Sequence, residues 1–361
     1  MQKNGNIPLF AKILLLLAAS SLAVSIVARR STAFAERISS GVGHKIRELL
    51  AALTSALPIS VGEFLITISP LIVIAVIVTA ARITEGSRMR FLSGFLAVLS
   101  LFYSGYVYTL GVGYHRESLE NMLLLDESEV NAESLYSTAV VLNGECISLL
   151  DEISFGISGS SISDISFDEM SSEAIKGYDR LIADYPELNI KNFNSTAKAV
   201  RSSKVMTYLD LLGVYTYFTG EANVNVHYPD YTTPFTVAHE MAHQRGISRE
   251  EEANFTAFLV CIRSDSAYVR YSGYMNMLEY VASALYKTDR ELYKKLVSEY
   301  DERTKGEINA LREFYLQNKN EALGQLSDKV NDTYLKAQGT DGVVTYSYVV
   351  RLAVSYYESE K

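Results

Sequence analysis

Apolar runs and charged stretches divide the chain at about residue 114. Three apolar runs precede that point, at about 7–28, 64–81 and 91–114, and the second and third contain no charged residue. Each has about the 17–25 residues that a helix needs to cross the hydrocarbon core of a bilayer. Because backbone polar groups in lipid must be bonded within the segment, the pattern predicts three transmembrane helices.

The first run also has features of a signal peptide. Lys3 and Lys12 are the positive charges of such a segment, and Ala33-Phe34-Ala35 loosely fits a cleavage site. Arg29 and Arg30 interrupt this pattern and favour an uncleaved anchor. Buried core helices are the alternative for all three runs, but uncharged stretches of 18 and 24 residues favour membrane spans.

The loops between the runs carry positive charge on both sides of the second run. Residues 29–63 contain five Lys/Arg and residues 82–90 contain three Arg, so the positive-inside rule does not orient the spans. From about 37 to 53, apolar residues recur at helical spacing between charged residues. The pattern predicts an amphipathic helix that lies at the membrane surface or packs on a soluble domain.

The rest of the chain shows helical spacing over most of its length, at about 115–150, 167–190 and 236–337. The Ser- and Gly-rich stretch 153–166 is typical of a loop. Apolar and polar residues alternate between Gly220 and Pro229, which predicts a short strand. The predicted fold is therefore mainly α: a membrane domain at 1–114, then a mostly helical soluble domain at 115–361 with a small β element near residues 220–229.

Composition and charge sharpen the division. The chain has 361 residues and is 48% hydrophobic, which excludes disorder as its main state. Residues 1–114 hold ten Lys/Arg and four Asp/Glu, so the remaining residues carry a net charge of −15 within the total of −9. A domain with this much negative charge is a poor candidate for nucleic-acid binding. Cys146 and Cys261 are too few for a disulfide framework.

The candidate chemistry lies between Pro234 and Gly246, in the segment Pro-Phe-Thr-Val-Ala-His-Glu-Met-Ala-His-Gln-Arg-Gly. On a helix, His239 and His243 project from one face, which suits two nitrogen ligands of a tetrahedral zinc. Glu240 lies beside them, where a carboxylate can take a proton from water at the metal. Gly246 is suited to end that helix sharply.

A catalytic zinc normally keeps three protein ligands and one water. No histidine follows His243, so a third ligand is expected to be a carboxylate. Three consecutive glutamates begin another apolar helix: Glu251 and Glu252 continue its apolar face, whereas Glu250 is expected to point elsewhere. Helical periodicity does not decide between Glu251 and Glu252. A run of three glutamates is also typical of a solvated helix start.

The predicted strand precedes the metal helix along the chain. Residues 222–227 are a candidate edge strand for an extended peptide substrate, with Asn223 and Asn225 as substrate-binding residues. His227 is a candidate fourth metal ligand, although a structural hydrogen bond is the commoner role of a histidine at a strand end.

A tetrahedral oxyanion needs a hydrogen-bond donor besides zinc. Tyr271 and Tyr274 follow the glutamate-rich helix and are candidate stabilisers of such an oxyanion. The chain contains 25 tyrosines, so packing is the commoner role for any one of them.

The motif His239-Glu240-x-x-His243 followed by Glu252-Ala253-Asn254 resembles the gluzincin arrangement of zinc peptidases. This resemblance implies a mostly helical, zincin-like domain at 115–361, with its small β element before the metal-binding helix. More closely, most of the chain resembles a bacterial family of multi-pass membrane proteins known only as a domain of unknown function. The matching segments are Pro58–Glu63, Phe218–Asn223, Pro234–Gly246, Glu251–Phe255, Tyr271–Tyr274 and Asp341–Val343. The resemblance implies Glu252 as the third ligand and a zinc-dependent, peptidase-like activity on the extracytoplasmic side, and it does not imply a substrate.

These features together predict a membrane-anchored zinc metallopeptidase acting on a peptide or protein. Zn²⁺ would be bound by His239, His243 and Glu252, with Glu240 as general base. The expected location is a bacterial cell membrane, as a multi-pass protein in contact with the lipid bilayer. An intramembrane protease is disfavoured, because the motif lies 125 residues beyond the last apolar run. The alternative from another class is a non-catalytic sensor or scaffold that keeps zinc for structure.

Overall fold

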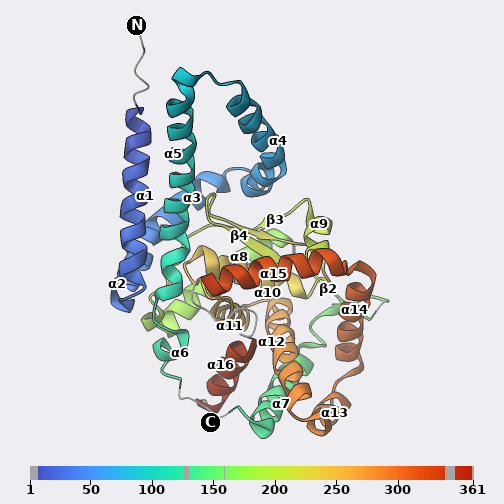
Figure 1. Cartoon of the computed structure of the whole chain (residues 1–361). Helices are drawn as coiled ribbons and strands as arrows, with labels where there is room; N and C mark the ends of the chain where they lie inside the picture. The colour runs from blue at the N-terminus through green and yellow to red at the C-terminus, as the bar shows by residue number, and fades with distance from the viewer. Residues whose placement is uncertain (1–6, 126–129, 158, 338–345, 360–361) are drawn as a thin grey trace. The chain divides into compact units, whose positions relative to one another are not determined.

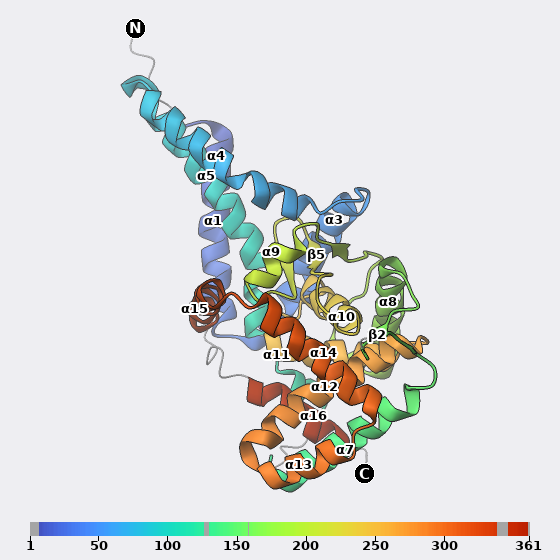
Figure 2. The same cartoon turned by 90° about the vertical axis from the view of Figure 1, so that its right-hand side faces the viewer.

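The computed structural model describes a mainly helical protein (Figures 1 and 2), over residues 7–125, 130–157, 159–337 and 346–359. The chain forms two compact units. The first unit contains residues 1–116 and 216–221, and the second contains residues 117–215 and 222–361. The matching segment Asp341–Val343 lies outside the described residues.

The first unit contains the three apolar runs as long helices, α1 (Leu9–Ala28), α4 (Val61–Arg82) and α5 (Glu85–Thr109). Each is long and apolar enough to cross a membrane. Helices α1 and α5 lie side by side (Figures 1 and 2). The third span was predicted at 91–114 but begins earlier and ends at Thr109, because the chain continues as a 3-10 helix over Gly111–His115.

Between α1 and α4 the chain forms α2 (Thr32–Ile38), a π-helical turn (Ser39–Gly43) and α3 (His44–Ser55). The amphipathic helix predicted at about 37–53 is thus interrupted by the π turn. Helix α2 begins where the Ser31 side chain accepts the Phe34 N–H at 3.3 Å, which caps a free donor of the first turn.

The short segment 216–221 completes the first unit. The Glu221 carboxylate accepts the N–H groups of Val61 and Gly62 at 3.0 and 2.7 Å, and so satisfies free donors in the first turn of α4. The Phe218 ring lies edge-on to Phe102 of α5, with 5.4 Å between ring centroids. This segment was predicted to belong to the soluble domain, which was expected to begin at residue 115.

The second unit is mainly helical and contains two small sheets. Its helices are α6 (Leu119–Met122), α7 (Ala132–Leu149), α8 (Phe167–Asp184), α9 (Ser203–Tyr208), α10 (Thr232–Gln244), α11 (Glu250–Cys261), α12 (Ala267–Thr288), α13 (Arg290–Ser298), α14 (Glu302–Asn318), α15 (Glu321–Ala337) and α16 (Tyr346–Ser359). Its strands are β1 (Ser154–Phe155), β2 (Ser161–Ile162), β3 (Lys198–Ala199), β4 (Gly213–Thr216) and β5 (Glu221–Val224), the last beginning at a residue of the first unit.

The core of the second unit forms where α10, α11 and α12 pack against one another and against α7, α8 and α16. All residues of α10 except His239 are buried, which places this helix at the centre of the unit. Cys146 and Cys261 are buried free thiols, so no disulfide joins them. Several helices begin at a polar side chain that caps the first turn, namely Asn131, Ser166, Ser266, Asp289 and Asp301.

The sheets differ from the sequence prediction in two ways. The predicted loop 153–166 contains the antiparallel pair β1 and β2, with Ser154 opposite Ile162. The predicted edge strand is in fact the middle strand, since the order of the second sheet is β3-β5-β4. Strand β3 runs parallel to β5 with Lys198 opposite Asn223, and it is too short to give a periodic signal in the sequence.

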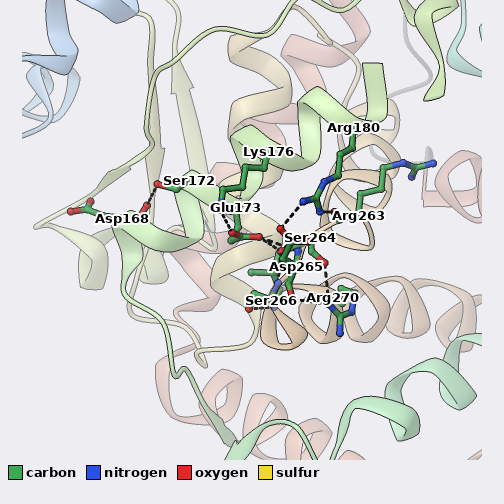
Figure 3. A network of polar contacts seen from close by, with 11 residues as sticks. Asp168, Ser172, Glu173, Lys176, Arg180, Arg263, Ser264, Asp265, Ser266 and Arg270 are labelled. Atoms are coloured by element: carbon green, nitrogen blue, oxygen red, sulfur yellow. Dashed lines mark hydrogen bonds and ion pairs between the residues drawn. The ribbon is translucent and has the colours of Figure 1, made fainter. Parts of the chain in front are cut away.

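A polar network fixes the turn between α11 and α12 against α8 (Figure 3). Glu173 on α8 accepts the Ser264 hydroxyl at 2.6 Å and the Asp265 N–H at 3.1 Å. Arg180, two helical turns further along α8, donates to Asp265 at 2.6 Å. Helix α11 is therefore held at its end, where Arg270 also donates to the Ser264 carbonyl at 3.0 Å.

Candidate metal centre

The two histidines of the motif lie together on α10. Their Nε2 atoms are 3.1 Å apart, as the i, i+4 spacing predicts. The helix that carries them is fixed at its start, because the Ser272 hydroxyl accepts the Phe235 N–H at 3.1 Å and donates to the Tyr231 carbonyl. The histidines therefore project from a rigid, buried helix.

The end of α10 orients one of the two imidazoles. Gly246 adopts a positive φ of 98° and closes the helix, with the Ile247 N–H bonded to the Ala242 carbonyl at 3.0 Å. The same turn places the Ile247 carbonyl 2.7 Å from Nδ1 of His243. A carbonyl only accepts, so Nδ1 carries a hydrogen and the neutral ring keeps its lone pair on Nε2, the atom that faces His239.

A carboxylate from α11 completes the cluster. Oε2 of Glu250 lies 3.4 Å from Nε2 of His239 and 3.5 Å from Nε2 of His243. The expectation that Glu250 points elsewhere is therefore wrong. The five residues between α10 and α11 form so tight a turn that the first residue of α11 faces back over the end of α10.

Glu252, the ligand implied by the resemblance, has other partners in the structure. Its Oε1 accepts from Arg249 at 2.6 Å and from the Leu119 N–H of α6 at 3.0 Å. Among the described residues, the cluster of possible metal-ligand atoms within 4.8 Å of one another contains Glu250 and not Glu252. Glu252 instead ties the start of α11 to α6.

The spacing of the three atoms fits a tetrahedral ion. With metal–ligand distances near 2.0–2.1 Å, two ligands of a tetrahedral zinc lie about 3.3–3.4 Å apart. The separations among His239, His243 and Glu250 are 3.1, 3.4 and 3.5 Å. Two imidazole nitrogens and one carboxylate oxygen are also a ligand set that zinc accepts.

Opposite charges stabilise the cluster without a metal. Burial alone would raise the pKa of Glu250, but the adjacent His243 and His239 hold it well below its usual value. Burial likewise opposes a charge on His243, yet the Glu250 carboxylate raises the pKa of that imidazole to about 9. A metal ion at this place would displace the proton of His243, because imidazole binds metals only through a free lone pair.

Glu240 lies beneath strand β4 and is buried. Its carboxylate accepts the Tyr215 N–H, and a Cβ at Gly213 would lie 2.6 Å from its Cγ, so β4 comes this close only because residue 213 is glycine. Burial raises the pKa of Glu240 to about 7, although the neighbouring His239 and His243 lower it. Oε2 of Glu240 is buried and has no hydrogen-bond partner among the described residues.

The candidate tyrosines serve the core of the unit. The Tyr271 hydroxyl donates to Oε2 of Glu307 at 3.4 Å, and its ring lies edge-on to Phe155. Tyr274 packs edge-on against Phe258 of α11, with 6.0 Å between ring centroids. The structure thus brings neither ring into the cluster of metal-ligand atoms.

The candidate residues in β5 and directly after it are also used within the fold. Asn223 and Asn225 are each 2% exposed, and the Asn225 amide donates to the Thr207 hydroxyl at 3.0 Å. His227 lies outside the metal cluster; its Nδ1 is 3.1 Å from the same hydroxyl, and its ring stacks edge-on against Phe314. A role for the two asparagines in substrate binding stays a prediction.

The sequence did not predict that Arg245 and Tyr178 would support α10. Arg245 is 1% exposed, donates to Asn192 at 2.6 Å and to the Phe193 carbonyl at 3.0 Å, and lies 4.5 Å from the centroid of the Tyr178 ring. Burial lowers the pKa of Arg245 to about 10. The Tyr178 hydroxyl in turn donates to the Ala238 carbonyl at 2.8 Å. The only sequence signal was an arginine directly before Gly246.

The described residues thus define a mainly helical protein with three long apolar helices and a partly buried histidine–glutamate cluster. The chain matches the family described as a protein of unknown function, DUF3810, over residues 39–354, and it belongs to that family. This confirms the resemblance to a family without an assigned function. No curated protein and no solved structure matches the chain.

Proposed function

We propose that the chain is a membrane-anchored zinc metallopeptidase. The observation that carries this proposal is the convergence of three ligand atoms from His239, His243 and Glu250, with the buried carboxylate of Glu240 beside them. The side chains of His239 and Glu250 are 14% and 38% exposed, so the cluster is reachable from solvent. A cluster that served only the fold would not need that access.

The three residues would hold one zinc ion with a fourth position left for water. When bound, zinc acts as a Lewis acid that polarises a carbonyl and lowers the pKa of water. The Ile247 carbonyl keeps His243 in the tautomer that presents Nε2. The Arg249 and Leu119 contacts of Glu252 hold the start of α11, and so hold Glu250 over the two imidazoles.

Glu240 would act as general base and then as general acid. It would take a proton from the attacking water and pass it to the departing amine of the peptide bond. A pKa of about 7 suits both steps near neutral pH, since one group must accept and release the proton. The Tyr215 N–H and the glycine at 213 fix the carboxylate in place for this transfer.

An extended peptide is the substrate that the surroundings favour. Strand β4 lies at the edge of the sheet order β3-β5-β4 and passes directly over Glu240. A peptide paired with such an edge would run past the base with its backbone in a fixed register. Strand β4 therefore replaces β5 as the proposed substrate strand.

The full-length protein in lipid nanodiscs tests the proposal. We expect one zinc per chain by metal analysis and cleavage of a mixed peptide library. Glu240→Gln should keep its zinc and lose turnover by about 10²–10⁴-fold, which is the usual share of general acid–base catalysis. Glu291→Gln on α13, whose side chain is 82% exposed, is the matched control and should behave as wild type.

Two results would reject the peptidase. Zinc without cleavage of any library would favour a non-catalytic sensor or scaffold that keeps zinc for structure. Absence of zinc from protein prepared with excess metal would reject both functions. Cleavage that survives in Glu240→Gln would reject Glu240 as the base.

We further propose a multi-pass arrangement in a bacterial membrane with the second unit on the extracytoplasmic side. The resemblance to a multi-pass family supports this side. Since both natural cysteines are buried, an exposed Glu291→Cys variant gives a clean label site. A membrane-impermeant maleimide should label this variant in intact cells; labelling only after lysis would place the unit in the cytoplasm.

A further inference from the structure

Helix α3 and the π turn before it have an inside-out distribution of side chains. Val42, Leu49 and Leu53 lie on one face and are 50%, 60% and 66% exposed. Arg47, on the opposite face, is 1% exposed. In a helix on a water-soluble surface, the charged residue lies outside and the leucines lie inside.

The inner face of α3 is filled by polar and close backbone contacts. The Arg47 guanidinium donates to the Ser39 carbonyl at 2.9 Å and to the Thr109 carbonyl at 3.3 Å. Gly220 in the segment 216–221 lies so close to α3 that a Cβ there would meet Cβ of Leu50 at 2.7 Å. The helix is therefore anchored without its leucine face, and the described residues leave that face largely exposed.

The contacts of α3 place it at the ends of two apolar spans. Arg47 binds the carbonyl of Thr109, the last residue of α5. Helix α3 ends at Ser55, and α4 begins only a few residues later at Val61. A helix at this position lies at the level where the spans enter or leave the hydrocarbon core.

The apolar face continues from α3 toward α4. Leu57 and Ile59 in the connecting segment are 45% and 37% exposed, and Phe64 in the first turns of α4 is 54% exposed. The charged Lys45 and Glu48 are exposed at the edges of the face. This is the arrangement of an interfacial helix, with an apolar face toward acyl chains and charges at headgroup level.

We propose that the apolar face formed by Val42 of the π turn and by Leu49 and Leu53 of α3 is inserted into the lipid bilayer at the boundary between headgroups and acyl chains. A bilayer is favoured over a protein partner because the face is continuous with the exposed apolar surface of α4. The inference does not depend on zinc or on peptidase activity.

The chain contains no tryptophan, so a single introduced tryptophan reports its own surroundings. We would place Leu49→Trp and Leu53→Trp, one helical turn apart, in the full-length protein in phosphatidylcholine–phosphatidylglycerol vesicles. Lipids brominated at different acyl positions then quench by contact. Both variants should be quenched best by bromines near the headgroup end of the chains, and little by aqueous iodide.

Two matched variants calibrate the depth. Ile74→Trp, in the middle of α4 and 56% exposed, should be quenched best by bromines deep in the acyl chains. Tyr286→Trp, on α12 and 45% exposed, should be quenched by iodide and not by bromolipids. If Leu49→Trp is quenched by iodide and not by bromolipids, as expected for Tyr286→Trp, the face of α3 lies in water and the proposal is overturned. If neither iodide nor bromolipids quench Leu49→Trp, the face is covered by a protein partner, such as a second copy of the chain, and the proposal is also overturned.

Discussion

Two partly buried clusters of titratable side chains among the described residues of the second unit are built differently. In the candidate metal centre, one nitrogen atom each from His239 and His243 and one oxygen atom from Glu250 converge. In the second cluster, on α12 and α14, Tyr231 donates to Glu279, and the Ser161 N–H donates to Glu307 at 3.0 Å.

The two clusters also differ in charge. The histidines hold the pKa of Glu250 low, so it stays ionised. Burial, together with the nearby Glu307, raises the pKa of Glu279 to about 7 despite the Tyr231 hydroxyl, and burial also raises the pKa of Glu307. Neighbouring imidazoles therefore keep Glu250 ionised, which suits a candidate metal ligand. A neighbouring carboxylate instead favours the protonated form of Glu279, which suits a structural hydrogen bond.

The largest expected effect separates the neighbouring glutamates of α11. Glu250→Gln should weaken zinc binding by more than about 100-fold, because it removes a proposed ligand and not a supporting residue. Glu252→Gln should weaken it by less than that, since it loses only contacts to Arg249 and Leu119. Competition with a chromogenic chelator measures both. The reverse order would restore Glu252 as the third ligand.

The next largest effect concerns the way in which strand β4 fixes the side chain of Glu240, the proposed general base. Gly213→Ala places a Cβ 2.6 Å from Cγ of Glu240 and must displace that side chain. We expect turnover to fall by about 100-fold, as for a catalytic group moved by about 1 Å, with zinc content unchanged. Gly144→Ala on α7, where no atom lies within 4 Å of an added Cβ, is the control. Equal turnover in the two variants would contradict the role of β4.

A smaller effect concerns stability in the second cluster. Glu279 has a folded-state pKa of about 7 against a usual 4.5, so the native state binds more protons than the unfolded state between these values. The free energy of unfolding should therefore fall as the pH rises through this window. Glu279→Gln should remove up to about 3 kcal/mol of that fall, at about 1.4 kcal/mol per pKa unit. Urea unfolding of wild type and of Glu279→Gln at pH 5 and pH 8 measures this difference. An equal change in unfolding free energy between the two pH values in both proteins would contradict the assignment to Glu279.

The smallest expected effect tests whether the Tyr271 hydroxyl serves the Glu279–Glu307 cluster or the candidate metal centre. Tyr271→Phe removes a hydrogen bond to Glu307 and should cost about 1 kcal/mol of stability. Turnover of the intact protein should not change, because the hydroxyl serves the second cluster. A large fall in turnover at unchanged stability would instead support the role of an oxyanion stabiliser.

The sequence predicted those features that depend on local spacing. Hydrophobic runs located the three apolar helices, and the i, i+4 spacing of His239 and His243 predicted their convergence. Gly246 was correctly expected to end α10. These inferences need only the geometry of one helix or the length of one run.

Features that depend on how two elements meet were not predictable in this way. The periodicity of α11 relates its residues to one another, but the turn at Gly246 decides that Glu250 faces α10. Gly213 approaches Glu240 across 27 positions of chain, and no local pattern marks that contact. Strand β5 alternates like an edge strand, yet it is paired on both sides.

The segment 216–221 has a consequence for any release of the protein from its membrane. Strand β4 supplies Gly213 and Tyr215 to Glu240, and the chain then passes directly into residues whose partners are Val61, Gly62 and Phe102. A proteolytic cut near residue 116 would free the second unit but strip these partners from the segment. Loss of these partners would loosen strand β4 and the contacts that hold the Glu240 carboxylate, so the proposed peptidase would lose turnover when cut from its anchor.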